Sequence, residues 1–134
     1  MEGKVMGYRS EVGLLLNKDA VEKLQDKLQE THDVIRQKVF ALLGEYADEH
    51  YVYDNATELW IWTNIKWYND FDDVGFIEKF LRTLHTDDYY FIRIGEALDD
   101  TETEGDYWDG DIEMAVSRKI TFIKPLGAEE SNDK

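Results

Sequence analysis

The amino-acid sequence contains no cysteine and a single proline, Pro125, among its 134 residues. The absence of cysteine excludes disulfides, thiolate metal ligands and a cysteine nucleophile, and it agrees with a reducing compartment. No apolar run approaches the roughly 20 residues that a membrane-spanning helix needs. Residues 1–18 also lack the apolar core of a signal peptide. We therefore expect a cytoplasmic protein without membrane attachment.

Basic residues are scarce, with 15 Lys and Arg against 30 Asp and Glu and a formal net charge of -15. Because phosphate groups are contacted chiefly by Lys and Arg, this imbalance argues against direct binding to nucleic acid. The hydrophobic content of 43% is far above that of a disordered acidic chain. We expect the charge to lie on one folded domain over residues 1–126, with residues 127–134 as a disordered tail.

The apolar spacing predicts an α+β fold. Alternation predicts a strand over residues 7–16, after which Asn17 is suited to cap a helix. Helical spacing predicts two segments within residues 18–47, with a bend at 31–33. Aromatic and β-branched residues predict a hairpin of residues 51–53 and 59–68. Further predictions are strands over residues 89–95 and 114–123 and, before them, a helix capped by Asp70 or Asp72, whose apolar stripe is Val74, Ile77, Phe80, Leu81 and Leu84.

This order of elements predicts a four- or five-stranded antiparallel or mixed sheet with helices packed on one face, a variant of the ferredoxin-like arrangement. Strict alternation within residues 59–68 has a further consequence, since it divides the side chains between two faces. One face is expected to hold Leu59, Ile61, Thr63, Ile65 and Trp67. Trp60 and Trp62 are expected on the other.

Residues 96–113 hold nine Asp or Glu and no Lys or Arg. Such a segment repels itself, so it needs either a structural role or a cationic partner. Tyr107 and Trp108 lie inside it and could anchor a contact, as aromatic residues often do at interfaces. The alternative is a solvated loop whose two rings fold back over the core. The predicted partner-binding residues are Asp99, Asp100, Glu102, Glu104, Asp106, Tyr107, Trp108, Asp109 and Asp111.

The same segment partly matches a calcium-binding loop, because acids and a glycine occupy relative positions 1, 3, 5, 6 and 12. The match is poor, since the flanking segments are predicted strands and Asp111 replaces the bidentate glutamate. The three histidines lie singly and share no metal-binding or catalytic motif. We therefore predict no enzyme, no metal site and no cofactor.

Arg9 and Arg93 fall within predicted strands, where a half-buried guanidinium usually needs a carboxylate partner. Glu11 and Glu96 are near them in the sequence, although spacing alone does not establish the pairs. We expect structural ion pairs here in preference to ligand binding.

Three stretches resemble a group of small acidic bacteriophage proteins. The stretches are Gly7-Tyr8-Arg9-Ser10-Glu11-Val12, Ile65-Lys66-Trp67-Tyr68 followed by Phe71-Asp72-Asp73-Val74, and Phe91-Ile92-Arg93-Ile94-Gly95-Glu96. The resemblance implies a phage or prophage origin, action in the cytoplasm of a host cell, and no catalytic residue. Small acidic phage proteins often act on host machinery, including restriction and CRISPR complexes.

Two main functional hypotheses follow, and a small hydrolase with an acidic metal site is a third, less favoured one. The first is an inhibitor that binds a basic surface of a host protein, such as a nucleic-acid-handling defence complex, and imitates the charge of DNA. The second is a structural or assembly protein that forms oligomers through its aromatic strand, with the acids serving solubility.

Overall fold

The computed structural model describes residues 7–97 and 99–107. The described elements are β1 (Ser10–Leu16), α1 (Lys18–Glu30), α2 (Asp33–Leu43), β2 (Glu49–Val52), β3 (Glu58–Ile65), α3 (Asp72–Leu81), the short 3-10 helix η1 (Thr86–Asp88), β4 (Tyr89–Gly95) and β5 (Thr101–Gly105). Among them no helix is both long enough and apolar enough to cross a membrane.

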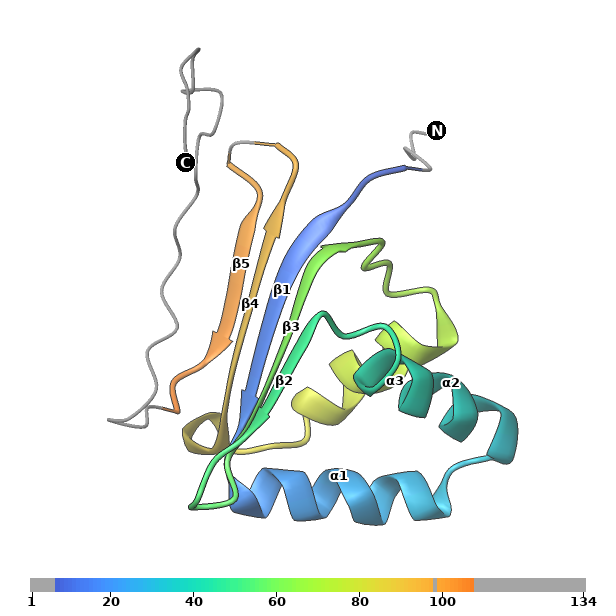
Figure 1. Ribbon diagram of the computed structural model, residues 1–134, viewed down its shortest axis with the longest axis vertical. Helices are drawn as coiled ribbons and strands as arrows, with labels where there is room; N and C mark the ends of the chain where they lie inside the picture. Colours follow the sequence, from blue (N-terminus) through green and yellow to red (C-terminus); the bar gives the residue numbers. More distant parts are fainter. Residues whose placement is uncertain (1–6, 98, 108–134) are drawn as a thin grey trace, which may run out of the picture.

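The strands form one antiparallel sheet in the order β2-β3-β1-β4-β5, and the three α-helices lie on one side of it (Figure 1). The order β2-β3-β1-β4 is the split arrangement of a ferredoxin-like fold, to which β5 is added next to β4. The predicted fold class is thus confirmed. The predicted strand over residues 114–123 and the domain boundary at 126 lie outside the described residues.

The helices begin and end largely where the sequence indicates. The Asn17 side chain accepts a hydrogen bond from the Ala20 N–H, as expected of an N-cap. The chain breaks at Thr31 before α2, whose N-cap is His32. The prediction that Asp70 or Asp72 caps α3 was wrong. Phe71 is the N-cap residue and has no side-chain cap, while Asp72 and Asp73 occupy the first turn, where the helix dipole favours acids.

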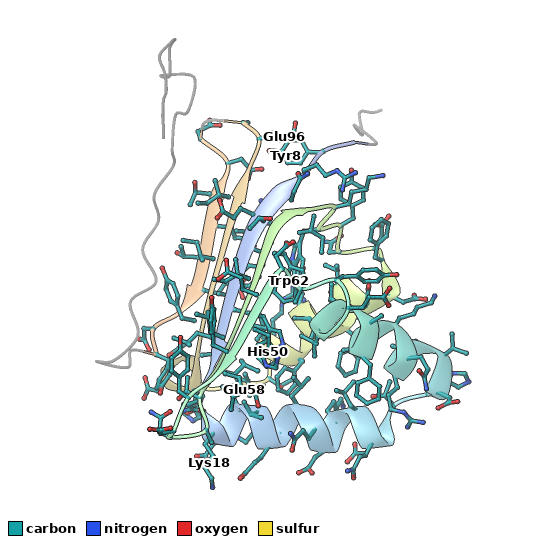
Figure 2. The ribbon with its side chains drawn as sticks, viewed as in Figure 1. Tyr8, Lys18, His50, Glu58, Trp62 and Glu96 are labelled. Atoms are coloured by element: carbon teal, nitrogen blue, oxygen red, sulfur yellow. The ribbon has the colours of Figure 1, made fainter. Side chains whose placement is uncertain are left out.

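The main core lies between the helices and the inner face of the sheet. It includes Val12, Leu14 and Leu16 of β1 together with Trp62, which is 0% exposed. Trp62 projects from β3 toward the helices (Figure 2), and its indole N–H donates a hydrogen bond of 3.0 Å to the carbonyl of Leu42 near the end of α2. That carbonyl is one of the last four of the helix, which lack partners within it. The bond therefore ties α2 to the sheet.

A β-bulge changes the predicted faces of β3. Ser10 lies opposite Ile65 but Val12 lies opposite Trp62, so two residues of β1 span three of β3. The extra residue reverses the alternation beyond the bulge. Leu59 and Ile61 share one face, as predicted, and it is the outer face of the sheet. Ile65 and Trp67 do not join them, because the bulge turns both toward the main core.

The two buried tryptophans of β3 allow a test of the α2 contact. The Nε1 atom of Trp60 is buried without a hydrogen-bond partner among the described residues, whereas that of Trp62 is bonded. Trp62→Phe leaves the Leu42 carbonyl buried and unpaired, so we expect it to lower the free energy of unfolding by about 2 kcal/mol more than Trp60→Phe does. Urea denaturation of both variants measures the difference. Equal losses would show that the bond to Leu42 contributes nothing.

Candidate functional site

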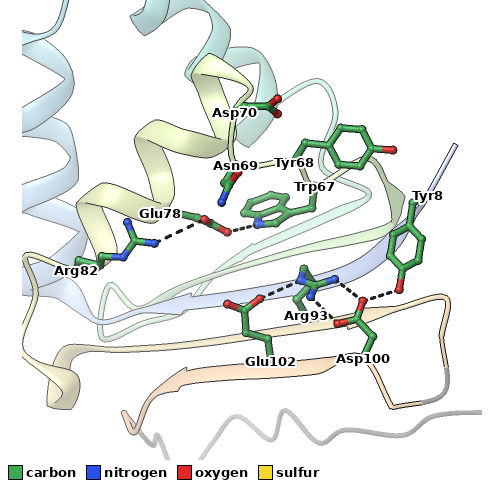
Figure 3. Close-up of a pocket in the computed structure, with 10 residues that line it drawn as sticks. All are labelled: Tyr8, Trp67, Tyr68, Asn69, Asp70, Glu78, Arg82, Arg93, Asp100 and Glu102. Carbon is green, nitrogen blue, oxygen red and sulfur yellow. Dashed lines mark hydrogen bonds and ion pairs between the residues drawn. The ribbon is translucent and has the colours of Figure 1, made fainter. Parts of the chain in front are cut away.

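A polar pocket of about 470 Å³ lies between α3, the chain that leads into it, and the strands β4 and β5. Figure 3 shows its walls, which are rich in carboxylates and aromatic rings. We call it the acidic pocket, and it is lined by Tyr8, Trp67, Tyr68, Asn69, Asp70, Glu78, Arg82, Arg93, Asp100 and Glu102.

Arg93 is the centre of the pocket's ion-pair network. Its two terminal nitrogens donate to the two oxygens of Asp100, at 3.1 and 2.7 Å, and its Nε donates to Glu102 at 3.0 Å. A fourth bond of 3.1 Å reaches the Ser10 hydroxyl of β1. Two-pronged contact between a guanidinium and a carboxylate is the strongest form of such a pair. The pKa of Arg93 is raised, and the main cause is its hydrogen bonds to Asp100. Burial acts in the opposite direction, and the bond to Glu102 adds to the rise.

Tyr8 closes one end of this network. Its hydroxyl donates to Asp100 at 2.5 Å and accepts from the Ala97 N–H at 3.2 Å. Gly95 makes this approach possible, because a Cβ atom there would collide with both the Asp100 carboxylate and the Tyr8 hydroxyl. The chain ahead of β1 is thus attached to the turn between β4 and β5 by side chains that only a glycine at position 95 accommodates.

Trp67 forms an aromatic wall of the pocket because of the bulge in β3. Its ring is 7% exposed, and its indole N–H donates to Glu78 of α3 at 2.9 Å. The other Glu78 oxygen lies 4.0 Å from Arg82, whose side chain is 64% exposed. Asp70 makes no hydrogen bond or ion pair with another described residue.

Negative charge exceeds positive charge at this site, since four carboxylates and two guanidinium groups line it. Glu104 lies next to the pocket on the same side of β5, and its pKa is raised. The causes, in order, are burial, the charge of Glu102 and the charge of Glu78, with Arg82 acting in the opposite direction. The charges of Glu102 and Glu78 thus still act on Glu104, although burial is the main cause of the raised pKa.

The structure separates the predicted partner-binding residues. Asp100 and Glu102 are engaged by Arg93, Asp99 and Asp106 are exposed, and Glu104 is half-buried beside the pocket. Tyr107 covers the outer face of the sheet, where its hydroxyl lies 2.9 Å from that of Thr57. This position matches the alternative in which the ring folds back over the core. Trp108, Asp109 and Asp111 lie outside the described residues.

Two features of this segment were missed from the sequence. Residues 101–105 form β5, a strand paired with β4, and not a loop. The carboxylate partners of Arg93 are Asp100 and Glu102, whereas Glu96 accepts a 2.7 Å bond from the backbone N–H of Arg9. A signal for both was present, since an arginine followed nine residues later by a glutamate fits a cross-strand pair in a hairpin.

No three His, Asp or Glu side chains of the described residues are placed to share a metal ion. Comparisons of the chain with models of protein families, with curated proteins and with solved structures found no match.

The two arginines of the pocket differ enough to test the network. Arg93→Lys keeps the charge but loses the planar fork, so we expect the free energy of unfolding to fall by about 2 kcal/mol. Arg82→Lys is the matched control and should cost less than about 0.5 kcal/mol, because its pair is exposed. Chemical denaturation measures both. A similar cost for the two changes would contradict the central role of Arg93.

The raised pKa of Glu104 predicts that the stability of the protein depends on pH. A carboxyl whose pKa is raised in the folded state holds its proton more tightly there than in the unfolded chain. The free energy of unfolding therefore falls as the pH rises and the carboxyl ionises. Glu104→Gln should therefore stabilise the protein at pH 7 by about 0.5 kcal/mol, the scale of one surface charge interaction. The gain should shrink as the pH falls and Glu104 of the parent protein becomes protonated.

Denaturation at a series of pH values tests this effect of Glu104. Glu11→Gln, which removes one charge from the outer face of the sheet, is the control and should give no such pattern. A Glu104→Gln variant that is less stable than the parent protein at pH 7 would contradict the sign.

Proposed function

We propose that this protein is an acidic, phage-type inhibitor that binds a basic, nucleic-acid-binding surface of a host protein, such as a restriction or CRISPR complex. It acts without catalysis, by occupying that surface. The acidic pocket receives a Lys or Arg side chain of the partner.

The supporting observation is the combination of unneutralised carboxylates and aromatic rings in one pocket. Asp70 and one oxygen of Glu102 are available as acceptors beside Trp67 and Tyr68. Cationic side chains bind favourably over aromatic faces, and Arg can add hydrogen bonds to carboxylates. Arg82, held only loosely by Glu78, can move aside for a competing cation.

The charge of the whole chain supports the same proposal. A net charge of -15 accelerates the approach of a basic partner and makes the association rate depend on salt. The side chains of β5 fit duplex imitation less well. Glu102, within β5, is already paired with Arg93. Asp100 is already neutralised. The site therefore favours individual cationic side chains over a groove that fits a complete duplex.

The resemblance to phage proteins favours a host protein as the partner. The second hypothesis, oligomers formed through the aromatic strand, loses its main surface because Trp60 and Trp62 are buried beneath the helices. Of the large hydrophobic residues in the hairpin, Tyr51 and Val52 at the edge strand β2 are exposed, at 45% and 65%. Light scattering tests this hypothesis, because a stable homo-oligomer would favour it.

Removing negative charge near the acidic pocket should weaken binding of a basic peptide more than removing the same charge elsewhere. Binding of a fluorescently labelled nona-arginine peptide, followed by anisotropy, should weaken roughly tenfold when Asp70 of the pocket and three predicted partner-binding acids outside the pocket are neutralised, because each contributes a partly screened attraction. Raising the salt from about 0.05 to 0.5 M should also weaken binding, because the Debye length shortens to roughly 4 Å. The site variant combines Asp70→Asn, Asp99→Asn, Glu104→Gln and Asp106→Asn.

The matched control removes four exposed acids from α1 and leaves the same net charge. It combines Asp19→Asn, Glu22→Gln, Asp26→Asn and Glu30→Gln. We expect this control to weaken binding less than threefold. Equal losses in the two variants would show that net charge alone attracts the peptide. DNA cleavage by a purified CRISPR effector and by a restriction enzyme then tests inhibition, which should be weaker with the site variant. Full cleavage with the parent protein by both would refute the proposed targets.

A further inference from the structure

A second pocket, of about 670 Å³, lies where the end of α2, the end of β3 and the start of α3 meet. It shares no lining residue with the acidic pocket. Leu42 and Val74, each 1% exposed, belong to the core and form its apolar base. Tyr46 and Phe71 line it while remaining 56% and 42% exposed. We call it the apolar pocket.

Exposed rings beside a cavity of this size are typical of a binding site. Pockets for small molecules have volumes of about 300–1,000 Å³ and combine apolar walls with a few polar groups. Among the exposed large hydrophobic side chains of the described residues, Tyr46 and Phe71 line this cavity. A ligand between the rings would remove both from water.

The polar groups of the apolar pocket indicate the charge of that ligand. Two of its lining residues are basic, Arg9 and Lys66. Lys66 makes no hydrogen bond or ion pair with another described residue. The Arg9 guanidinium makes one long bond, 3.4 Å, to the carbonyl of Asn64. Most of the donor capacity of both cations is therefore unused within the described part of the chain.

The two carboxylates of the pocket, in contrast, have structural partners. Asp48 accepts hydrogen bonds from the N–H and the hydroxyl of Thr63, at 2.7 and 3.1 Å, and so satisfies a donor at the β3 bulge. Asp73 accepts a 2.8 Å bond from the Val74 N–H in the first turn of α3, where the helix dipole stabilises it. These neutral donors leave both acids charged, but they fix the acids in place, whereas the two cations have no comparable structural partner among the described residues.

We propose that the apolar pocket binds a small organic anion, a carboxylic acid with an aromatic or branched hydrocarbon body. The body lies between Tyr46 and Phe71 over Leu42 and Val74, and the carboxylate lies against Arg9 and Lys66. This site is independent of the proposed inhibitor function, since it uses other residues and the opposite charge.

The experiment uses a probe of matching chemistry, 8-anilinonaphthalene-1-sulfonate, which joins aromatic rings to one negative charge and fluoresces in apolar surroundings. Lys66→Gln and Arg9→Gln should each raise its dissociation constant roughly three- to tenfold, because each removes one charge-assisted contact. N-phenyl-1-naphthylamine, a similar probe without the charge, should bind these variants and the parent protein alike. Lys79→Gln, an exposed lysine of α3 outside both pockets, is the control and should change neither probe.

Asp73→Asn reverses the expected sign, because it removes a negative charge beside the ligand while the amide oxygen can still accept from the Val74 N–H. It should tighten binding of the anionic probe about two- to threefold. Binding should also shift the NMR signal of the Trp62 indole N–H, whose acceptor Leu42 lines the pocket. Thermal melting shows that each variant is folded.

The signs of these changes decide the result. Weaker binding in Lys66→Gln and Arg9→Gln together with tighter binding in Asp73→Asn supports the site. Unchanged affinity in all three variants, or an unmoved Trp62 signal at saturation, would show that the probe binds elsewhere and would overturn the proposal. Reversed signs would show that Arg9 and Lys66 do not attract the anionic probe and would also overturn it.

Discussion

The pairing of Arg93 with Asp100 and Glu102 allows the most acidic part of the described chain to fold against the core. A half-buried guanidinium is stable only with carboxylates around it, and crowded carboxylates are stable only with a cation among them. Each therefore makes the other possible. The same guanidinium reaches Ser10, so one side chain joins β1, β4 and β5 on the inner side of the sheet. The acidic pocket exists because this network holds the β4–β5 hairpin beside α3.

The acids of this protein consequently fall into two groups with different physical roles. Some make hydrogen bonds within the fold, as Asp100 does with Arg93, Asp48 with Thr63 at the bulge and Asp73 with Val74 at the start of α3. Others, such as Asp70 and Asp106, leave their charge to the solvent. Net charge alone does not distinguish these groups, because it counts both equally. Under the proposed function, a basic partner would contact the second group, and the first group decides where the second is presented.

Sequence patterns predicted the elements that bury an apolar stripe and failed where polar contacts decide the structure. The strand over residues 89–95, the two helices on either side of Thr31 and the ferredoxin-like order follow from apolar spacing, since burial of those side chains dominates folding. β5 has no apolar side chain, and the cross-strand contact of Glu102 with Arg93 is polar, so apolar periodicity does not reveal the strand. The bulge at Thr63 and Asn64 was equally invisible, because it is set by backbone pairing with β1 and by Asp48.

The candidate site shows the same division. Asp100, Glu102 and Glu104 were named from their density in the sequence, whereas Tyr8, Trp67 and Glu78 come from distant parts of the chain. Only the folded arrangement brings them together. Tyr107 was named for its ring, but burial on the outer face is the more favourable position for it.

The extra residue in β3 has a consequence for how the chain can change. Lys66 lines one pocket and its neighbour Trp67 lines the other, and both positions depend on the phase that the bulge sets. Substitutions at either residue can adjust one cavity separately. Deletion of one residue at the bulge would move each following side chain to the opposite face of the sheet. Both cavities would be lost together. A substitution can therefore alter one cavity alone, whereas a deletion at the bulge alters both.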